Sequence, residues 1–331
     1  MQDKGNILIL SAGTRDKVVQ YFKKEMEGIG KVIATDCSNL APAVYDADGF
    51  YLVPRITEPG YVERILEICK KEQITGVFSL IDPELSLLAK ERARFLEIGT
   101  TPIVSDYELV EICFDKYKMF RLLEKMGIPT GKCYRDIESF QQARRQGEID
   151  YPVFVKPVCG SASIHINKVG SDKELNVLFD LYDDLMIQQF MDGQEYGADL
   201  YVDMLSGKCT DLFVKKKIKM RAGETDKSVS FKDERLFELL KNFAEQCGFR
   251  GMIDIDIFEI DGTYYLSEVN PRFGGGYPHA YACGVNMPKA VINNLMGREN
   301  PVTIGAYAEN ICMMKYNEIA IRDMSGTQIV P

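Results

Sequence analysis

The stretch MIDIDIFEIDGTYYLSEVNPRFGGG, residues 252–276, predicts two β-strands, a tight turn and a glycine-rich segment. Polar and apolar residues alternate on both sides of Asp261 and Gly262, a dipeptide typical of β-hairpins. Side chains two positions apart on a strand lie on the same face. Asp254 and Asp256 therefore lie on one face of the first strand, and Glu268 and Asn270 lie on one face of the second. The stretch predicts an antiparallel ribbon with one acid-rich side.

The length of the hairpin loop decides whether the two polar pairs meet on one face. A two-residue loop would place Asp256 opposite Ser267 and turn Glu268 to the other face, because register fixes which side chains share a face. A three-residue loop, with Gly262 in the left-handed conformation, would bring Asp256, Glu268 and Asn270 together. We predict the three-residue loop, since it gathers these oxygen-bearing side chains into one cluster.

Such a cluster suits Mg²⁺, which prefers hard oxygen ligands and commonly shares one or two carboxylates with substrate phosphates. A solvated face of a half-buried hairpin is the alternative for these residues. A second stretch, YPVFVKPVCGSASIHINKV at residues 151–169, resembles a phosphate site. Its presence favours a metal site over a solvated face for the acidic cluster. Small residues let backbone amides approach an anion closely, and a lysine adds a positive charge. The phosphate-binding candidates are Lys156, Gly160, Ser161, Ala162 and Ser163.

The metal site and the phosphate site support each other electrostatically. Two like unit charges 4 Å apart repel by about 4 kcal/mol at an effective dielectric constant of 20. Two carboxylates beside a triphosphate therefore need a cation between them. The small-residue loop is not a P-loop, because it lacks the G-K-S/T signature and leads to a strand.

Most of the chain beyond residue 150 alternates polar and apolar residues in short runs, which predicts an antiparallel sheet in an α+β domain. In the run DLFVKKKIKMR, residues 211–221, four basic side chains share one strand face, which either lines the phosphate site or is solvated, and we assign only Lys215 to the nucleotide site. Capping boxes predict two helix starts. Ser105 with Glu108 predicts one helix that continues toward Gly127, and Ser171 with Glu174 predicts another.

The first hundred residues alternate short apolar strands with amphipathic helices, which predicts a doubly wound parallel sheet. The turn SAGTRDK after the first strand has one glycine where a dinucleotide fold has G-x-G-x-x-G, so the pattern disfavours a dehydrogenase. Open sheets of this kind bind ligands at the carboxyl ends of their strands. The candidate substrate residues at those ends are Ser11, Thr14, Arg15, Asp82 and Glu84.

Composition limits the classes of partner and the cellular location. The 331 residues suggest two domains at roughly 150 residues each. A net charge of −9 disfavours nucleic acid or an anionic membrane as the main partner. Nine scattered cysteines without a C-x-x-C pair predict buried thiols in a reducing compartment. No window reaches the ~18 apolar residues of a membrane helix, so we predict a cytoplasmic protein.

Five segments together resemble the ATP-grasp superfamily: Asp115-Lys116, KMGIPT at 125–130, VFVKP at 153–157, QQFMDGQEY at 188–196 and EVNPRFGG at 268–275. The likeness covers nearly all of the chain and is greatest to single-module carboxylate ligases similar to the carbamoyl phosphate synthase large subunit. It implies an α/β pre-ATP-grasp domain followed by an α+β ATP-grasp domain whose two lobes enclose ATP between antiparallel sheets. The expected units are residues 1–113 and 114–331, the latter with lobes of about 114–187 and 188–331.

The resemblance also implies roles for individual residues. Lys116 and Lys156 would contact phosphates, and the loop from Gly160 to Ser163 would cover them. Groups near the end of a strand would bind adenine, and Glu195 would bind the ribose. The adenine-side residues are Gln188, Gln189 and Phe190.

The remaining implied roles concern the metal and the chemistry. Asp256, Glu268 and Asn270 would bind Mg²⁺ or Mn²⁺, and Arg272 would reach the transferred phosphoryl group. Together with Lys156, Arg272 is the expected catalytic residue. Gly274 to Gly276 would leave backbone room for a substrate.

The function implied is an ATP-dependent ligase that activates a carboxylate as an acyl phosphate, which an amine or another nucleophile then attacks. Its partners would be a small carboxylic acid and an amine, neither of which the sequence names. A kinase that phosphorylates a hydroxyl group and a nucleotide-binding protein without turnover are the alternatives. A homodimer is the default assembly, because dimers are the commonest oligomers.

Overall fold

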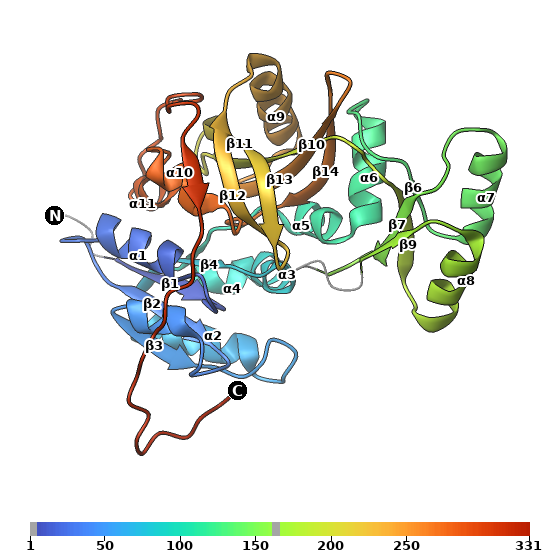
Figure 1. Ribbon diagram of the computed structural model, residues 1–331. Helices are drawn as coiled ribbons and strands as arrows, with labels where there is room; N and C mark the ends of the chain where they lie inside the picture. Colours follow the sequence, from blue (N-terminus) through green and yellow to red (C-terminus); the bar gives the residue numbers. More distant parts are fainter. Residues whose placement is uncertain (1–4, 161–165) are drawn as a thin grey trace.

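The computed structural model describes residues 5–160 and 166–331, and these residues form three β-sheets with flanking helices (Figure 1). A five-stranded parallel sheet comes first, and a four-stranded and a six-stranded antiparallel sheet follow. The predicted fold class, a parallel α/β domain followed by a domain of antiparallel sheets, is confirmed.

The first domain has the predicted doubly wound sheet, with strand order β3-β2-β1-β4-β5. Its strands are β1 (Asn6–Leu10), β2 (Val32–Asp36), β3 (Gly49–Leu52), β4 (Ile74–Ser79) and β5 (Thr101–Pro102). Its helices are α1 (Asp16–Glu25), the 3₁₀ helix η1 (Pro42–Asp46), α2 (Tyr61–Lys71), α3 (Asp82–Lys90) and α4 (Arg92–Glu97). Alternate residues of β1 enter two separate cores, so both faces of the sheet are covered. The strand order reverses between β1 and β4, which is where such sheets bind ligands.

Two helices, α5 (Tyr107–Phe114) and α6 (Lys116–Lys125), stand where we predicted one, so that prediction was wrong. The chain leaves the helical conformation at Asp115, whose carboxylate accepts hydrogen bonds from the backbone of Tyr117 and Lys118. An aspartate in this position offers the next turn a cap and so starts a new helix. The cap expected from Ser105 was also wrong, because the Ser105 hydroxyl accepts from the Arg250 backbone N–H instead (3.0 Å).

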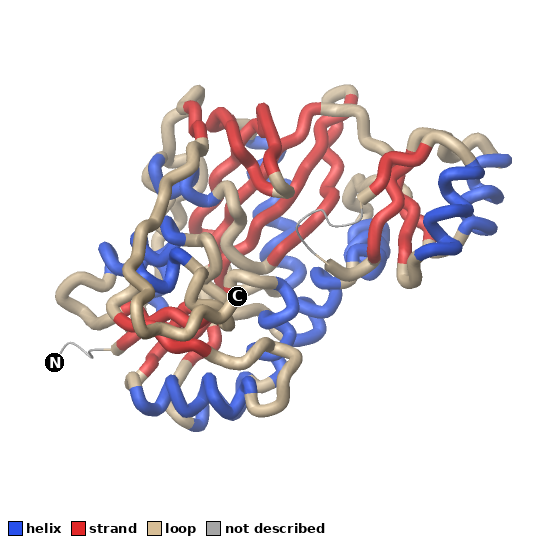
Figure 2. The backbone as a smooth tube through the Cα atoms, turned by 60° about the horizontal axis from the view of Figure 1, so that its bottom comes forward, coloured by secondary structure: helices blue, strands red, loops and turns tan. Residues whose placement is uncertain are grey.

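The small lobe contains a four-stranded sheet in the order β6-β9-β7-β8. Its strands are β6 (Cys133–Tyr134), β7 (Val153–Pro157), β8 (Asn167–Val169) and β9 (Leu185–Gln189), and its helices are α7 (Ile137–Arg145) and α8 (Asp172–Leu181). The predicted cap of α8 is confirmed, since Ser171 accepts from the Glu174 backbone. Both helices cover the face of the sheet turned away from the large sheet (Figure 2). The opposite face is left for the cavity between the lobes.

The large lobe contains a six-stranded antiparallel sheet in the order β14-β13-β10-β11-β12-β15. Its strands are β10 (Gln194–Val202), β11 (Cys209–Arg221), β12 (Glu224–Phe231), β13 (Gly251–Ile260), β14 (Thr263–Asn270) and β15 (Cys312–Met314). Its helices are α9 (Glu234–Cys247), α10 (Tyr277–Ala282) and α11 (Met287–Leu295). We did not predict β12, because its buried positions are polar, Ser228 and Ser230 among them, and give no apolar alternation.

The hairpin β13–β14 has the predicted pairing but a different loop. Asp256 lies opposite Glu268, as expected, and Gly262 is left-handed (φ 77°). However, Ile260 pairs with Thr263, so the loop has two residues, and Asp261 is also left-handed (φ 49°). The extra residue is a β-bulge at Ser267, between the Ile257 and Asp256 rungs of the ladder. The predicted three-residue loop was wrong, because the bulge rather than the turn restores the register.

The C-terminal residues return to the first domain as an extended segment, red in Figure 1. Asn39 binds it with two hydrogen bonds, donating to the Gln328 carbonyl (2.6 Å) and accepting from the Val330 backbone (2.7 Å). The segment therefore connects the large lobe with the loop after β2.

All nine cysteines are free thiols, and Cys69, Cys113, Cys133 and Cys209 are buried. Within residues 5–160 and 166–331, no helix combines the length and the apolar character needed to cross a bilayer.

Candidate active site

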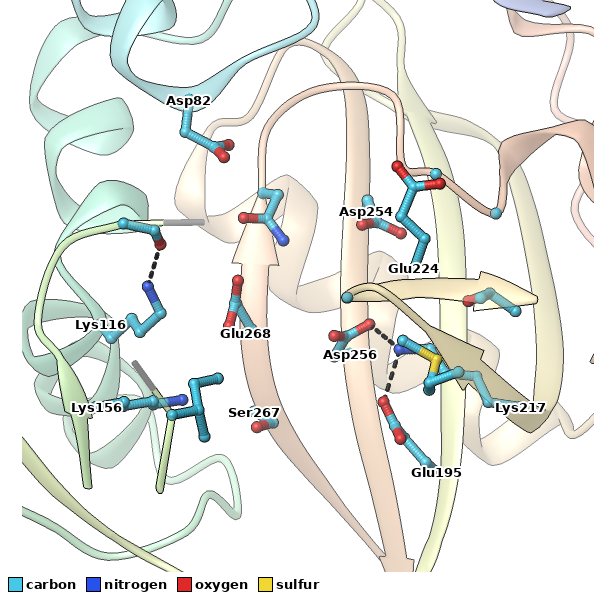
Figure 3. A pocket seen from close by; sticks show the side chains of 18 of the residues that line it. Asp82, Lys116, Lys156, Glu195, Lys217, Glu224, Asp254, Asp256, Ser267 and Glu268 are labelled. Atoms are coloured by element: carbon cyan, nitrogen blue, oxygen red, sulfur yellow. Dashed lines mark hydrogen bonds and ion pairs between the residues drawn. The ribbon is translucent and has the colours of Figure 1, made fainter. Parts of the chain in front are cut away.

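A cavity of about 910 Å³ lies where the first domain, the small lobe and the large lobe meet. Figure 3 shows its walls: Lys116 and Lys156 on one side, the hairpin β13–β14 in the middle, and Lys217 with Glu195 on the other side. Asp82 of the first domain stands at one end. The predicted site residues that line the cavity are Arg15, Lys116, Lys156, Gly160, Gln188, Gln189, Glu195, Asp256, Glu268, Asn270 and Arg272.

Lys116 and Lys156 form the small-lobe wall. Lys156 faces the cavity because its neighbours Val153 and Val155 on β7 pack into the core under the helices. Lys116 begins α6, and its ammonium group donates to the Gly160 carbonyl at the start of the small-residue loop. Burial lowers the pKa of Lys156, although the negative charge of Glu268 opposes that effect. Ser161, Ala162 and Ser163 lie outside the described residues.

The hairpin brings the three metal candidates onto one face. Asp256 lies opposite Glu268, and Asn270 lies opposite Asp254 on the next rung of that face. All four side chains line the cavity. In the described part of the chain, no group of three His, Cys, Asp or Glu side chains is arranged to hold a metal ion. The candidate set offers only oxygen atoms, two carboxylates and one amide, which fits Mg²⁺ or Mn²⁺ better than a softer metal.

Asp254, which we did not assign to the metal, has a pKa raised to about 7. Burial is the main cause, and the negative charges of Asp256 and Asp199 add to it. The charges of Lys215 and Arg272 oppose this rise, and Arg272 Nη1 lies 3.9 Å from Asp254 Oδ2.

Lys217 is a cavity residue that the sequence analysis missed. Its buried ammonium group lies between Glu195 (2.7 Å) and Asp256 (2.6 Å), as Figure 3 shows. Burial alone would lower the pKa of Lys217, but these two carboxylates outweigh that effect and raise it. Its side chain starts on β11 and passes β10 beside Gly197, where a Cβ atom would lie 3.1 Å from the Cε atoms of both Lys217 and Lys215. A glycine inside the strand β10 was the signal that side chains of a neighbouring strand pass close to its backbone.

The assignment of Lys215 to the nucleotide is not supported by its position. Lys215 is 1% exposed and forms a buried ion pair with Asp199. Gly276 covers it, since a Cβ atom there would lie 2.6 Å from Lys215 Cε. The lysine next along the same strand face, Lys217, reaches the cavity instead.

The adenine-side candidates lie at the end of β9. Gln188 and Gln189 line the cavity, and the Gln189 backbone N–H donates to the Lys132 carbonyl (2.8 Å). The Phe190 ring contacts Phe154 edge to face and lies 3.7 Å from the Lys168 ammonium group. It is absent from the cavity wall formed by the described residues. Phe190 can therefore support the strand end without exposing its ring to a ligand.

The candidates from the first domain separate into two groups. Arg15 lines the cavity and forms an ion pair with Glu224 (2.9 Å), at the tip of the hairpin between β11 and β12. Thr14 is exposed to solvent, whereas Glu84 is fully buried. Glu84 accepts hydrogen bonds from Tyr61 and Ser79, and burial raises its pKa.

Neither Ser11, Thr14 nor Glu84 is among the described residues that line the cavity. Their assignment to the substrate stays a prediction. Arg15 and Asp82 reach the cavity from the two sides of the point where the strand order reverses.

The glycines after β14 pass close to charged side chains, and Gly275 and Gly276 line the cavity. A Cβ atom at Gly274 would lie 2.3 Å from Asp254 Oδ1, and one at Gly275 would lie 2.6 Å from Glu224 Cδ. The space that these glycines leave is thus occupied by charged side chains of the protein itself. The glycines let the chain pass close to those groups.

The architecture and the cavity together define a nucleotide-binding fold with a lysine wall, an oxygen-rich wall and a third wall from a parallel-sheet domain. Residues 7–103 match the family described as PylC-like, N-terminal domain, and residues 113–276 match the ATP-grasp domain. The chain belongs to the ATP-grasp superfamily.

Among curated proteins, the chain is similar to the arginine-specific large chain of carbamoyl phosphate synthase from Geobacillus stearothermophilus. The identity is 23% over 340 residues, which covers 95% of this chain and 31% of the relative. The large chain from Clostridium botulinum strain Langeland is 27% identical over 276 residues, covering 76% of this chain and 24% of that protein. The chain thus spans less than a third of the length of these relatives.

Among solved structures, the fold is similar to the biotin carboxylase domain of Hydrogenobacter thermophilus 2-oxoglutarate carboxylase, in complex with MgADP, ADP and bicarbonate. The TM-score is 0.73 at 15% identity, with 92% of this chain and 73% of that chain covered. An L-amino acid ligase from Bacillus licheniformis has a TM-score of 0.68 at 19% identity, covering 91% and 76%.

Proposed function

We propose that this protein is an ATP- and Mg²⁺-dependent ligase that activates a carboxylate as an acyl phosphate and joins it to an amine. One observation carries the proposal: Lys116 and Lys156 face Asp256, Glu268 and Asn270 across a single cavity. A cationic wall can hold a triphosphate, and an oxygen-rich wall can hold the metal that neutralises it. Bound Mg²⁺ would supply charge neutralisation between the carboxylates and the phosphates.

The residues of the chain would contribute mainly by positioning and by charge. Lys156 and Lys116 would bind phosphate oxygens of ATP, and Glu195 would accept hydrogen bonds from the ribose. The substrate carboxylate would attack the γ-phosphorus, giving the acyl phosphate and ADP. Arg272 would stabilise the charge on the phosphoryl group during this transfer. The amine would then attack the acyl carbon and release inorganic phosphate.

The metal role is tested by Glu268→Gln, which keeps the size of the side chain and removes its charge. ADP release should be measured against a panel of small carboxylic acids, each with an amine or hydroxylamine. We expect an acid- and Mg²⁺-dependent activity in the wild type that falls by at least about 100-fold in Glu268→Gln, the scale seen when one transition-state contact is lost. With hydroxylamine, the product should be a hydroxamate.

Glu259→Gln is the matched control, because Glu259 lies on β13, bonds to Tyr196 (2.8 Å) and is not among the described residues lining the cavity. It should retain wild-type activity. Near-normal turnover of Glu268→Gln would exclude the metal role. Phosphate transferred stably to a hydroxyl substrate would identify a kinase, and nucleotide binding without turnover across the panel would indicate a binding protein.

A further inference from the structure

Arg272, at the end of β14, is bound by a carboxylate from the first domain, 190 positions away in the sequence. Arg272 Nε lies 2.8 Å from Asp82 Oδ1, and Arg272 Nη2 donates to Asp82 Oδ2 at 3.0 Å. The two side chains are only 11% and 10% exposed. One hydrogen bond at Oδ2 and one ion-pair contact at Oδ1 together constrain the orientation of the guanidinium group as well as its position.

The pairing determines which N–H groups of Arg272 remain for a ligand. Asp82 engages the Nε and Nη2 side of the guanidinium group. Nη1 donates to the Phe273 carbonyl (3.2 Å) and lies on the side of Asp254. Since Nη1 carries two hydrogens, one remains available toward the cavity that Arg272 and Asp254 both line.

Asp82 is itself held rigidly. It is the first residue of α3, three positions after β4 ends at Ser79, and Pro83 follows it in the first turn of the helix. This position is at the carboxyl end of β4, beside the reversal of strand order. The first domain thus presents one fixed carboxylate to the ATP-grasp domain at the site where such sheets usually bind their own ligands.

We propose that Asp82 is a positioning residue, which orients the guanidinium group of Arg272 for the transferred phosphoryl group, so that the first domain completes the phosphoryl-transfer site. This inference rests on the proposed function, because it assigns Arg272 to that group. The Asp82 charge lies against the guanidinium group at two contacts, of which the one at Oδ2 is a hydrogen bond and the one at Oδ1 is an ion pair without hydrogen-bond geometry. A carboxylate that only joined the two domains would affect stability and leave recognition of the phosphoryl group unchanged.

The test uses Asp82→Asn, which preserves the shape and removes the charge that holds the guanidinium group. Binding of ADP with Mg²⁺ is measured by calorimetry with and without aluminium fluoride, which mimics the transferred phosphoryl group. The wild type should bind ADP more tightly with the fluoride. In Asp82→Asn the ratio of the ADP affinity with aluminium fluoride to that without it should be about tenfold smaller, which is the equivalent of one charge-assisted hydrogen bond. The affinity for ADP alone should stay unchanged.

Glu25→Gln is the control. Glu25 also joins the first domain to the large lobe, accepting from Tyr281 (3.1 Å) and Asn286 (2.8 Å), and it is not among the described residues lining the cavity. This variant should keep the full gain. If Asp82→Asn does not fold, Asp82→Glu keeps the charge but moves the guanidinium group, and it should show the same loss.

The outcomes separate the two proposals. A wild type that gains nothing from aluminium fluoride would overturn the proposed function and this inference with it. If aluminium fluoride raises the ADP affinity of the wild type and of the Asp82 variant equally, this inference alone is overturned. A lower melting temperature with an unchanged gain would also overturn it, since that result describes a link between domains only.

Discussion

Lys217 occupies the position between Glu195 and Asp256 where a bound cation would reduce the repulsion of the two acids. The lysine ammonium group and Mg²⁺ therefore have related electrostatic roles beside Asp256. Removing one partner of a buried ion pair is costly, because the other charge is left without compensation. Both carboxylates keep about a quarter of their side-chain surface exposed, which reduces that cost through solvent screening.

We expect Lys217→Met to destabilise the protein by about 1–3 kcal/mol, less than for a fully buried pair. We also expect Mg²⁺ to raise the melting temperature of this variant more than that of the wild type, because the metal can approach Asp256 without competition. Differential scanning calorimetry with and without Mg²⁺ measures both effects. Lys219→Met, at an exposed position of the same strand, is the control. An equal response to Mg²⁺ in variant and wild type would refute the competition.

At the scale of elements, the hairpin β13–β14 depends on a single extra residue. The two-residue turn alone would set Asp256 opposite Ser267, and the bulge at Ser267 moves Glu268 into that place instead. Since side chains alternate along a strand, one residue more or less in β14 exchanges its two faces. The bulge thus positions two of the three metal candidates.

Inserting one alanine after Ser267 should turn Glu268 and Asn270 away from Asp256 and abolish the Mg²⁺ dependence of ADP binding, because the bulge accommodates only one extra residue. ADP affinity measured by calorimetry at several Mg²⁺ concentrations checks this expectation. Ser267→Ala keeps the residue count and should behave as the wild type. Retention of the Mg²⁺ dependence after the insertion would show that the hairpin can accommodate a second extra residue without changing the face of Glu268.

At the scale of the whole molecule, the extended C-terminal segment connects the large lobe with the first domain. Lys315 begins it, donating to Glu224 (2.8 Å) at the edge of the cavity, and Asn39 holds its far end. Asn39 is 3% exposed, so its two hydrogen bonds are shielded from water. The segment therefore spans from a residue of the cavity wall to the loop after β2.

Asn39→Ala should release the far end of this segment, because both hydrogen bonds made by the Asn39 amide are lost. Trypsin should then cut after Arg322 at a rate about tenfold higher, which corresponds to roughly 1.4 kcal/mol of lost binding. Mass spectrometry of timed digests measures the rate. Ser325→Ala, whose hydroxyl bonds only within the segment to Asp323 (2.6 Å), serves as the control. Equal cleavage of Asn39→Ala and the wild type would show that other contacts hold the segment.

The sequence predicted those parts of the site that depend on short-range alternation. Asp256, Glu268 and Asn270 were expected on one face, and Lys156 was expected at the end of a strand beside a small-residue loop. The pairing of Asp256 with Glu268 is confirmed, although the predicted cause was wrong. The error arose because loop length and a bulge can produce the same register, and the local sequence does not distinguish them.

By itself, the sequence determined the order of the sheets, the polar face of the hairpin and the lysines of the small lobe, because side-chain period and turn residues are local properties of the chain. Only the tertiary structure decided that Lys217 rather than Lys215 reaches the cavity, and that Asp82 binds Arg272. The first choice depends on the acids of neighbouring strands, since Asp199 binds Lys215 whereas Glu195 and Asp256 bind Lys217, and the second depends on the packing of two domains. Such contacts join residues distant in sequence, and alternation within one strand carries no information about them.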